Sequence, residues 1–190
     1  MTKKMEVHQT PIPGVFLIDA FVATDIRGNF VKDYSREAFK SNGIEHNLDE
    51  TFYTSSYKGV IRAIHFQRKK QQPKLVRCIN GLVYDVVVDL RKESPTYRQW
   101  VGYYLAGDGY KSVLVPSGCG HGYLVLEDSI VSYKCAERFY GEYDDGIMWD
   151  DPDIGIDWPL EKVGHQVILA DKDKKLQSFE MFEKNYSKFL

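Results

Sequence analysis

Paired cysteines, a basic excess and long apolar runs are all missing from this 190-residue sequence. The three cysteines, Cys78, Cys119 and Cys135, are odd in number and irregular in spacing, and no CxxC pair occurs. This pattern excludes a disulfide framework and a structural zinc site, and it predicts reduced, buried thiols in a cytoplasmic protein. No stretch approaches the roughly 18 apolar residues of a membrane span, and Met1 does not lead into the apolar segment of a signal peptide.

Charge and motif content narrow the function further. The formal net charge is −2, so the basic excess typical of a nucleic-acid-binding surface is absent. No GxGxxG, Walker loop or nucleophile elbow is present, so hydride-transfer and covalent serine chemistry lack their signatures. The closely spaced His pair of metal-binding jelly rolls is also missing, because Ala63 and Gln67 stand on either side of His65. We therefore expect no metal.

Aromatic residues are abundant instead, with 13 Tyr, 10 Phe and 3 Trp. Aromatic rings fit the half-buried surface of a strand, and they suit a pocket that stacks a base or a sugar. No repeat or long linker divides the chain, and its length suits one domain better than two. We predict a single all-β domain over residues 1–190, an antiparallel sandwich or barrel such as a jelly roll, with short helices.

The predicted strands are separated by turns. They are Phe16–Val22, Gly59–Gln67, Lys74–Ile79, Leu82–Leu90, Trp100–Leu105, Lys111–Val115, Gly122–Leu126 and Ser129–Cys135. Asn80-Gly81 predicts a hairpin between the third and fourth of them. Ser35–Asn42 is predicted to be a helix, capped by Ser35 and ended by Gly43, and Phe179–Phe189 is a candidate terminal helix.

Strict alternation along Gly59–Gln67 predicts two distinct faces. Val60, Arg62 and Ile64 fall on one face, and Ile61, Ala63 and His65 on the other. Arg62 and His65 therefore share a pocket only if a twist or a bulge intervenes.

Four residues are candidates for chemistry, each with a plainer structural alternative. The imidazole of His65 suits proton transfer near neutral pH, although a strand histidine is often structural. His121 lies in a glycine-rich segment that is either an ordinary turn or a loop that lets a ligand approach the backbone closely. Tyr133 is either a core residue or a phenol that gives or takes a proton. Asp173 belongs to a charged run that is either a solvated turn or the source of a carboxylate that orients a histidine.

Taken in order, these segments resemble the dTDP-4-dehydrorhamnose 3,5-epimerase family over about residues 10 to 175. No single motif decides the resemblance, but the joint order and spacing are specific. The matching segments are Asp25–Phe30, Gly59–Gln67, Lys74–Arg77, Val86–Arg91 with Ser94–Thr96, Pro116–Gly122, Tyr133–Lys134, Gly146–Pro152 and Gly155–Leu160.

The resemblance implies a cupin-like jelly-roll homodimer with no metal and no organic cofactor. Its substrate is a 4-keto-6-deoxyhexose linked to a nucleoside diphosphate, used in cell-surface polysaccharide synthesis. By matching position, His65 is the base, Tyr133 is the acid on the opposite ring face, and Lys74 lies beside the C4 oxygen. Asp173 holds His65, with the neighbouring Asp171 as an alternative.

The chemistry agrees with these residue types. A proton beside a ketone is acidic because its removal gives an enolate, which a positioned ammonium stabilises. A base on one face and an acid on the other then invert the carbon. The resemblance further implies that Arg27, Arg62 and Lys172 neutralise the diphosphate and that His121 contacts the sugar. The other predicted substrate contacts are Phe30, Lys32, Glu50, Gln67 and Tyr140.

Several positions depart from the family pattern. Lys32 replaces a usual Glu, and Glu50 and Phe52 stand in a segment that usually carries Gln and Asn and helps to recognise the base. A carboxylate such as Glu50 can accept hydrogen bonds from two donors of guanine, whereas thymine offers one. GDP therefore stands beside dTDP as a candidate nucleotide.

The predicted sugar pocket departs as well. Ala63 and Gly120 replace a Gly and an Ala, and Phe139 replaces a Tyr. A heptose thus stands beside a hexose, and the inverted carbon is C3, C5 or both.

Two further functions compete with epimerisation. A 3,4-ketoisomerase on the same jelly roll would move the carbonyl instead of inverting carbons, and it would need only one proton-transfer group where His65 and Tyr133 supply two. A non-catalytic sugar-nucleotide-binding module would keep Arg27 and Arg62 but would not need the pair of His65 and Asp173.

Overall fold

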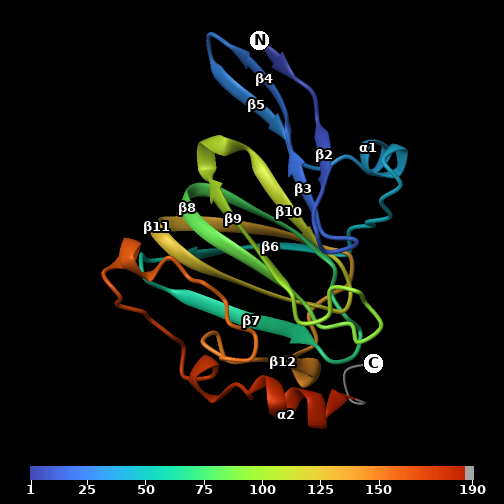
Figure 1. Ribbon diagram of the computed structural model, residues 1–190. Helices are drawn as coiled ribbons and strands as arrows, with labels where there is room; N and C mark the ends of the chain where they lie inside the picture. Colours follow the sequence, from blue (N-terminus) through green and yellow to red (C-terminus); the bar gives the residue numbers. More distant parts are fainter. Residues whose placement is uncertain (187–190) are drawn as a thin grey trace.

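Two long strands run side by side through the domain and carry most of its architecture (Figure 1). They are β8, Lys74–Asp89, and β11, Cys119–Cys135, in a computed structural model that describes residues 1–186. The two strands pair antiparallel from Cys119 opposite Asp89 to Cys135 opposite Lys74.

The other strands of the main sheet flank this pair in the order β12-β7-β11-β8-β10-β3-β2, with β6 also on β11 and β9 also on β8. Their bounds are β2 Glu6–Gln9, β3 Phe16–Asp19, β6 Glu50–Ser56, β7 Ile61–Gln67, β9 Trp100–Ala106, β10 Lys111–Val115 and β12 Asp144–Gly146. These strands pair antiparallel throughout. The curled antiparallel sheet with its short helices confirms the predicted all-β, cupin-like jelly-roll class.

The predicted hairpin at Asn80-Gly81 is wrong. A hairpin requires its two arms to pair with each other, but both arms of β8 pair with β11, Val76 opposite Tyr133 and Val83 opposite Val125. The dipeptide instead lies where the β8–β11 register shifts, and Gly81 supplies the positive φ of +82° that this irregularity needs. For the same reason the two predicted strands Gly122–Leu126 and Ser129–Cys135 are parts of the single strand β11.

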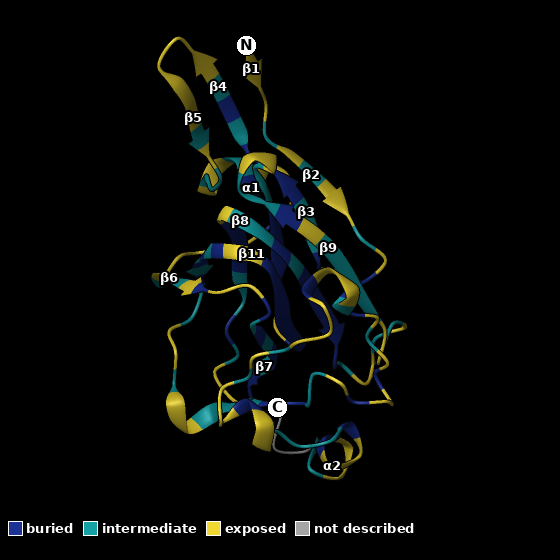
Figure 2. Ribbon diagram, turned by 90° about the vertical axis from the view of Figure 1, so that its left-hand side faces the viewer, coloured by how far each residue is buried: buried dark blue, intermediate teal, exposed yellow. Residues whose placement is uncertain are grey.

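A small second sheet projects from one end of the domain (Figure 1). It consists of β1 Thr2–Lys3, β4 Phe21–Asp25 and β5 Gly28–Lys32. The predicted strand Phe16–Val22 is therefore split between two sheets, with the break at Ala20. Figure 2 shows that the β4–β5 hairpin is largely exposed, and its turn carries the fully exposed Ile26.

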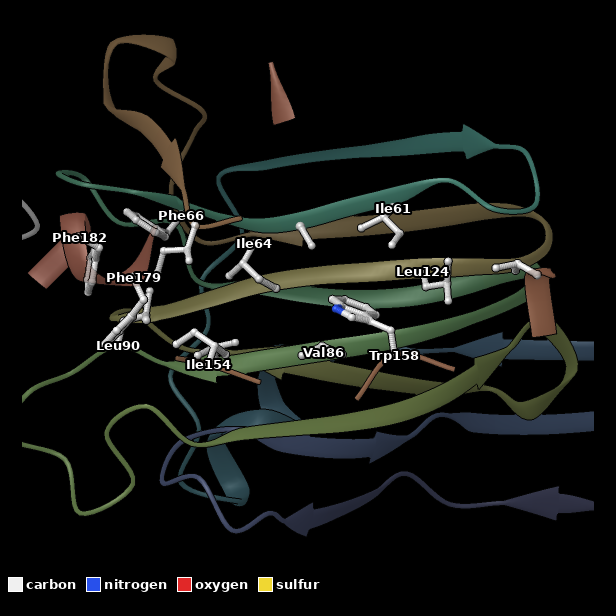
Figure 3. Close-up of a cluster of buried hydrophobic side chains, with 14 of the residues drawn as sticks. Ile61, Ile64, Phe66, Val86, Leu90, Leu124, Ile154, Trp158, Phe179 and Phe182 are labelled. Carbon is white, nitrogen blue, oxygen red and sulfur yellow. The ribbon is translucent and has the colours of Figure 1, made fainter. Parts of the chain in front are cut away.

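A large apolar cluster packs one face of the main sheet against the C-terminal part of the chain (Figure 3). The sheet contributes aliphatic side chains such as Ile64 and Leu124, and Trp158, Phe179 and Phe182 cover them. Each such buried side chain contributes about 1.5–3 kcal/mol to folding. The cluster therefore holds the chain after residue 146 firmly against the strands that form the pocket described below.

Both predicted helices are present, and both are short. Helix α1, Arg36–Ser41, is capped by Ser35, whose Oγ accepts a hydrogen bond from the Ala38 amide at 3.4 Å. Helix α2, Phe179–Lys184, starts where predicted and stops before Phe189, which lies with residues 187–190 outside the described part. Within residues 1–186, no helix is long and apolar enough to cross a lipid bilayer.

Candidate active site

An extra residue in β7 brings Arg62 and His65 to the same side of the strand. On β11 the paired residues His121 and Tyr123 are two positions apart, whereas their partners on β7, His65 and Arg62, are three apart. One strand thus carries one residue more than its neighbour, which is a β-bulge. The bulge that the sequence requires for Arg62 and His65 to share a pocket is therefore present.

The bulge also corrects the predicted faces of this strand. Ala63 and Ile64 are consecutive in the chain, yet both are buried in the cluster beneath the C-terminal segment. Arg62 and His65 line a pocket on the other side. Strict alternation, with Ile64 beside Arg62, is therefore wrong across the bulge.

The glycines around His121 serve the protein itself. A Cβ at Gly122 would lie 2.7 Å from the Arg62 carbonyl oxygen and from Ala63 Cα, and one at Gly120 would lie 2.5 Å from Ile64 Cγ2. Both glycines belong to β11 and not to a loop. They allow the bulged β7 to approach β11 closely, so the predicted approach of a ligand to this backbone is not their structural cause.

One pocket assembles eight of the predicted site residues. They are Arg62, His65, Gln67, Lys74, His121, Tyr133, Lys172 and Asp173. Its volume is about 200 Å³, below the roughly 300–1,000 Å³ of sites for drug-sized ligands. The pocket thus suits a single sugar ring, with the rest of a sugar nucleotide outside it.

One side of the pocket carries a histidine–aspartate pair, the predicted base and its support. His65 Nε2 lies 3.4 Å from Asp173 Oδ2, and the imidazole is 21 % exposed while the carboxylate is 4 % exposed. The second oxygen of Asp173 is buried without a hydrogen-bond partner. Asp171 is 89 % exposed and pairs with Lys174, so Asp173 and not Asp171 is the carboxylate beside His65.

The pocket is also lined by a buried phenol, that of the predicted acid Tyr133. Tyr133 is 7 % exposed. Burial, together with the neighbouring Tyr123 and the charge of Asp85, raises the pKa of its hydroxyl well above the usual value. Phe52 stacks on the Tyr133 ring at 4.7 Å between centroids and 16° between planes. The phenol is thus held protonated and in a fixed orientation.

Lys74 places an ammonium group at the same pocket. Its pKa is lowered by burial, and the charges of Cys135, Asp144 and Asp85 partly offset this. An ammonium that is poorly hydrated interacts strongly with any negative charge that develops nearby.

A second histidine–aspartate pair was missed by sequence reasoning. His121 Nε2 lies 2.9 Å from Asp85 Oδ2, and both side chains are almost fully buried. The other carboxylate oxygen of Asp85 has no hydrogen-bond partner. An acid inside the apolar run Leu82–Val88 was the available signal, because a buried charge requires a partner.

Three predicted residues lie away from the pocket of this chain. Arg27, Phe30 and Lys32 belong to the projecting β4–β5 hairpin. Arg27 makes a bidentate pair with Asp25, with Nη2 at 2.6 Å from Oδ2. Phe30 is 60 % exposed, and Lys32 lies over the ring of Phe21.

Glu50, Gln67 and Tyr140 form hydrogen bonds at the pocket rim. Glu50 Oε1 accepts from Gln72 Nε2 and from the Phe139 amide, each at 2.9 Å. Gln67 accepts from the Tyr140 amide at 2.6 Å and donates to the Arg138 carbonyl at 3.3 Å. These bonds anchor residues 138–140, and Phe139 lines the pocket.

One cluster of possible metal ligands occurs within residues 1–186, and it lies on β2 and β3. Glu6, His8 and Asp19 form it. Asp19 already pairs with Lys111 at 2.9 Å and with Lys3 at 3.5 Å. Two ammonium groups beside the buried carboxylate disfavour a cation there.

Comparison with known families agrees with this arrangement. The family model described as dTDP-4-dehydrorhamnose 3,5-epimerase matches residues 9–181. The chain belongs to this family. It is an isomerase-class enzyme, an epimerase of nucleotide-linked 4-keto-6-deoxy sugars.

Members of this family from distant organisms cover nearly the whole chain. A dTDP-4-dehydrorhamnose 3,5-epimerase from Methanothermobacter thermautotrophicus is 46 % identical over 167 residues, 87 % of this chain and 90 % of the relative. A dTDP-6-deoxy-D-glucose 3,5-epimerase from Legionella pneumophila, solved with dTDP-4-keto-L-rhamnose, superposes with a TM-score of 0.90 at 33 % identity and covers 96 % of each chain. A Bacillus anthracis dTDP-4-dehydrorhamnose 3,5-epimerase, solved with TDP and PPi, gives 0.86 at 36 % identity and covers 93 % of this chain and 100 % of that one.

Proposed function

We propose that this epimerase inverts C3 and C5 of a dTDP-linked 4-keto-6-deoxyhexose, and that His65 and Tyr133 are its proton-transfer groups. The observation that carries the proposal is their meeting in one pocket with Lys74. The two groups come from different strands, β7 and β11. A base and an acid on separate walls can act on opposite faces of one ring.

The proposed reaction needs only side chains of this protein. His65, supported by Asp173, takes the proton from the carbon beside the ketone, and the electron pair of the C–H bond moves onto the C4 oxygen. The ammonium of Lys74 stabilises the resulting oxyanion. The enolate then collapses while Tyr133 delivers its proton to the other face of the carbon. Arg62 and Lys172, at the same pocket, neutralise the diphosphate.

We further propose a homodimer in which each β4–β5 hairpin completes the site of the other copy. Arg27 and Phe30 match the family motif, yet in one chain they lie on an exposed projecting hairpin. The pocket also has exposed aromatic residues at its rim, Phe52 and Phe139. In such a dimer, the hairpin of one copy covers the exposed rim of the other copy's pocket, and that pocket in turn receives Arg27 and Phe30.

The nucleotide is proposed to be dTDP. Glu50 Oε1 accepts bonds from Gln72 and from the Phe139 amide, so this oxygen is occupied by the protein itself. This weakens the case for guanine, which depends on a carboxylate that is free to accept two donors. The solved relatives above were found with dTDP-4-keto-L-rhamnose or with TDP.

The test is solvent deuterium uptake. The protein is incubated in D2O with dTDP-linked or GDP-linked 4-keto-6-deoxyglucose, and the product is examined by mass spectrometry and NMR. We expect deuterium at C3 and C5 with inversion for dTDP and little reaction for GDP. A C3-keto product would instead identify a ketoisomerase, and preferred turnover of GDP would overturn the nucleotide assignment. Binding without any exchange would favour the non-catalytic binding module.

The shared site is tested by complementation. Arg27→Ala and His65→Ala homodimers are each expected to be nearly inactive. Mixed and reassembled, they should regain about a quarter of wild-type activity, because half of the dimers are mixed and each has one intact site. No recovery, or a monomer by light scattering, would contradict the proposed dimer.

A further inference from the structure

The projecting β4–β5 hairpin is held by the barrel at both of its ends (Figure 1). Where the hairpin begins, the Ala20 amide donates to the Tyr110 carbonyl at 2.9 Å. Where it ends, Asp33 Oδ2 accepts from Lys134 Nζ at 2.7 Å and from Arg77 Nη1 at 3.4 Å. The side chains of Asp33 and Arg77 are 14 % and 8 % exposed, so solvent ions screen this pair weakly. The base of the hairpin is therefore fixed to the main sheet.

A further contact holds the hairpin close to its turn. Asn29, one residue after the start of β5, donates through Nδ2 to the Tyr110 hydroxyl at 2.7 Å. Its Oδ1 accepts from the hydroxyl of Thr24, its register partner on β4, at 2.6 Å. The bond to Tyr110 thus holds both strands of the hairpin near the turn that carries Arg27.

Arg77 joins these two points of attachment. Its guanidinium pairs with Asp33 at the base of the hairpin, and Cζ of the same group lies 5.6 Å from the centroid of the Tyr110 ring. A cation over an aromatic face is attracted by the ring. Arg77 belongs to β8 and lies opposite Ser132 of β11, so it is placed by the two long strands. One buried side chain therefore contacts both residues that fix the direction of the hairpin.

The backbone of Tyr110 gives independent support for a role of its side chain. Its φ of +53° and ψ of +28° lie in the left-handed region, which is uncommon for a residue with a Cβ and which glycine adopts freely. Such a conformation persists where the surrounding contacts hold it. Here the carbonyl, the ring and the hydroxyl of Tyr110 all contact the hairpin or its anchor. The position therefore carries a tyrosine for its contacts, although glycine suits the turn better.

We propose that Arg77, acting through Asp33 and Tyr110, positions the β4–β5 hairpin for entry into the site of a second copy, an inference that rests on the proposed function. None of the three is among the described residues that line the pocket, so they are positioning residues and not catalytic ones. Without these anchors the hairpin samples many orientations, and only a fraction of them places Arg27 in the partner's site. The apparent affinity for substrate then falls by that fraction, whereas substrate that is bound reacts as before.

Tyr110→Phe is the mildest test, because it removes the bond to Asn29 and keeps the ring beside Arg77. We expect the KM for dTDP-linked 4-keto-6-deoxyglucose to rise about two- to tenfold, the usual weight of one hydrogen bond, with kcat within about twofold of the wild-type value. Arg77→Met releases both anchors and should raise KM further. Tyr103→Phe is the matched control, since Tyr103 is a half-buried tyrosine that packs on the apolar cluster inside the barrel. Its KM should equal that of wild-type protein.

Mixed dimers separate positioning of the hairpin from a general structural effect. When Arg27→Ala and His65→Ala chains combine, the intact site joins the pocket of the Arg27→Ala chain to the hairpin of the His65→Ala chain. Tyr110→Phe in the His65→Ala chain should raise the KM of that site as it does in the homodimer. In the Arg27→Ala chain it affects a hairpin that already lacks its arginine, and the KM should not change. A structural defect would instead raise KM equally in both arrangements, and that result would overturn the proposal.

A second measurement needs no substrate and so separates this inference from the proposed reaction. Amide hydrogen exchange of residues 21–32, followed by mass spectrometry, should be at least about fivefold faster in Tyr110→Phe and Arg77→Met and unchanged in Tyr103→Phe. Faster exchange in a dimer that inverts no substrate would overturn the reaction and support the anchoring.

Two results count against the inference in different ways. An active dimer in which Tyr110→Phe changes neither KM nor hairpin exchange would overturn the positioning role alone. A monomeric wild-type protein would overturn the proposed dimer and the positioning role with it. If Arg77→Met does not fold, Tyr110→Phe decides the question by itself.

Discussion

Two histidine–aspartate pairs face the same pocket from neighbouring strands, and they differ in almost every property except composition. His65 and His121 are register partners on β7 and β11. His65 lies 3.4 Å from Asp173 and is 21 % exposed. His121 lies 2.9 Å from Asp85 and is 5 % exposed. The first pair is therefore widely spaced and partly exposed to solvent, and the second is closely spaced and buried.

The difference shows how one constellation serves two purposes. An exposed imidazole can exchange its proton with water between turnovers, as a base must. A buried imidazole held by a buried carboxylate keeps one ring orientation, and it can position a substrate but cannot readily cycle a proton. We therefore propose that His65 transfers protons and that His121 contacts the sugar, and each experiment below tests that division.

The largest effect should come from replacing the two histidines in turn. His65→Ala is expected to abolish deuterium uptake at both carbons, a loss of at least about 10²–10⁴ for a missing general base. His121→Ala should retain measurable exchange and mainly raise KM. Uptake is measured by mass spectrometry in D2O, with His165→Asn at an exposed position as the control. An equal loss of deuterium uptake in His65→Ala and His121→Ala would show that the two histidines do not have the separate roles proposed here.

Lys74→Met should separate activity from stability. The rate is expected to fall about 10²–10³-fold, the usual effect of losing an oxyanion donor. Stability should move the other way. Because burial lowers the pKa of Lys74 in the folded state below its usual 10.5, the wild-type protein carries a penalty at neutral pH that disappears as the pH rises towards that value.

The methionine has no such penalty. We expect the free energy of unfolding of Lys74→Met, measured in urea at pH 7, to exceed that of the wild-type protein by about 1 kcal/mol. This difference should shrink as the pH rises towards 10.5, because the wild-type penalty disappears there. A less stable variant at pH 7 would show that the ammonium is better solvated than its burial indicates.

Replacing the two aspartates should affect different properties, the rate for Asp173 and the stability for Asp85. Asp173→Ala is expected to lower the rate at least about tenfold, or 1.4 kcal/mol of activation free energy, with a small change in stability because its partner His65 is 21 % exposed and can be hydrated instead. Asp85→Ala leaves buried His121 unpaired and should cost about 1–3 kcal/mol of unfolding free energy. Urea unfolding and initial rates are compared for the two variants. The same loss pattern in both would mean that the pairs are equivalent.

The smallest effect is expected at Asp171, two residues from Asp173. Its carboxylate is exposed and pairs with Lys174 on the surface, where ion pairs contribute little. Asp171→Asn should keep the wild-type rate and melting temperature. A rate loss close to that of Asp173→Ala would move the supporting role to Asp171.

Local patterns in the sequence predicted the strands better than their connections. Alternation and turn residues located β7, β9 and β10 closely. Asn80-Gly81 misled the prediction, because a dipeptide suited to a hairpin also suits an irregularity inside a long strand. Only the partner strand decides between the two, and pairing over many residues is not visible in a local window.

The candidate site followed a similar division. Family resemblance located His65, Tyr133 and Lys74, which the structure brings into one pocket. Asp85 was missed, because it reads as part of an apolar strand and gains its meaning only from His121, far along the chain. Arg27 shows the opposite limit, since a single chain leaves it outside the pocket.

The bulge in β7 makes the length of this strand as important as its composition. Losing one residue between Arg62 and His65 would place the two residues two positions apart, where plain alternation keeps both on the pocket side without a bulge. In an evolutionary alignment, a one-residue gap placed there would indicate a regular strand with the same pair on one face, whereas the three-residue spacing requires the bulge. Insertions and deletions at this point thus carry information that residue identity does not.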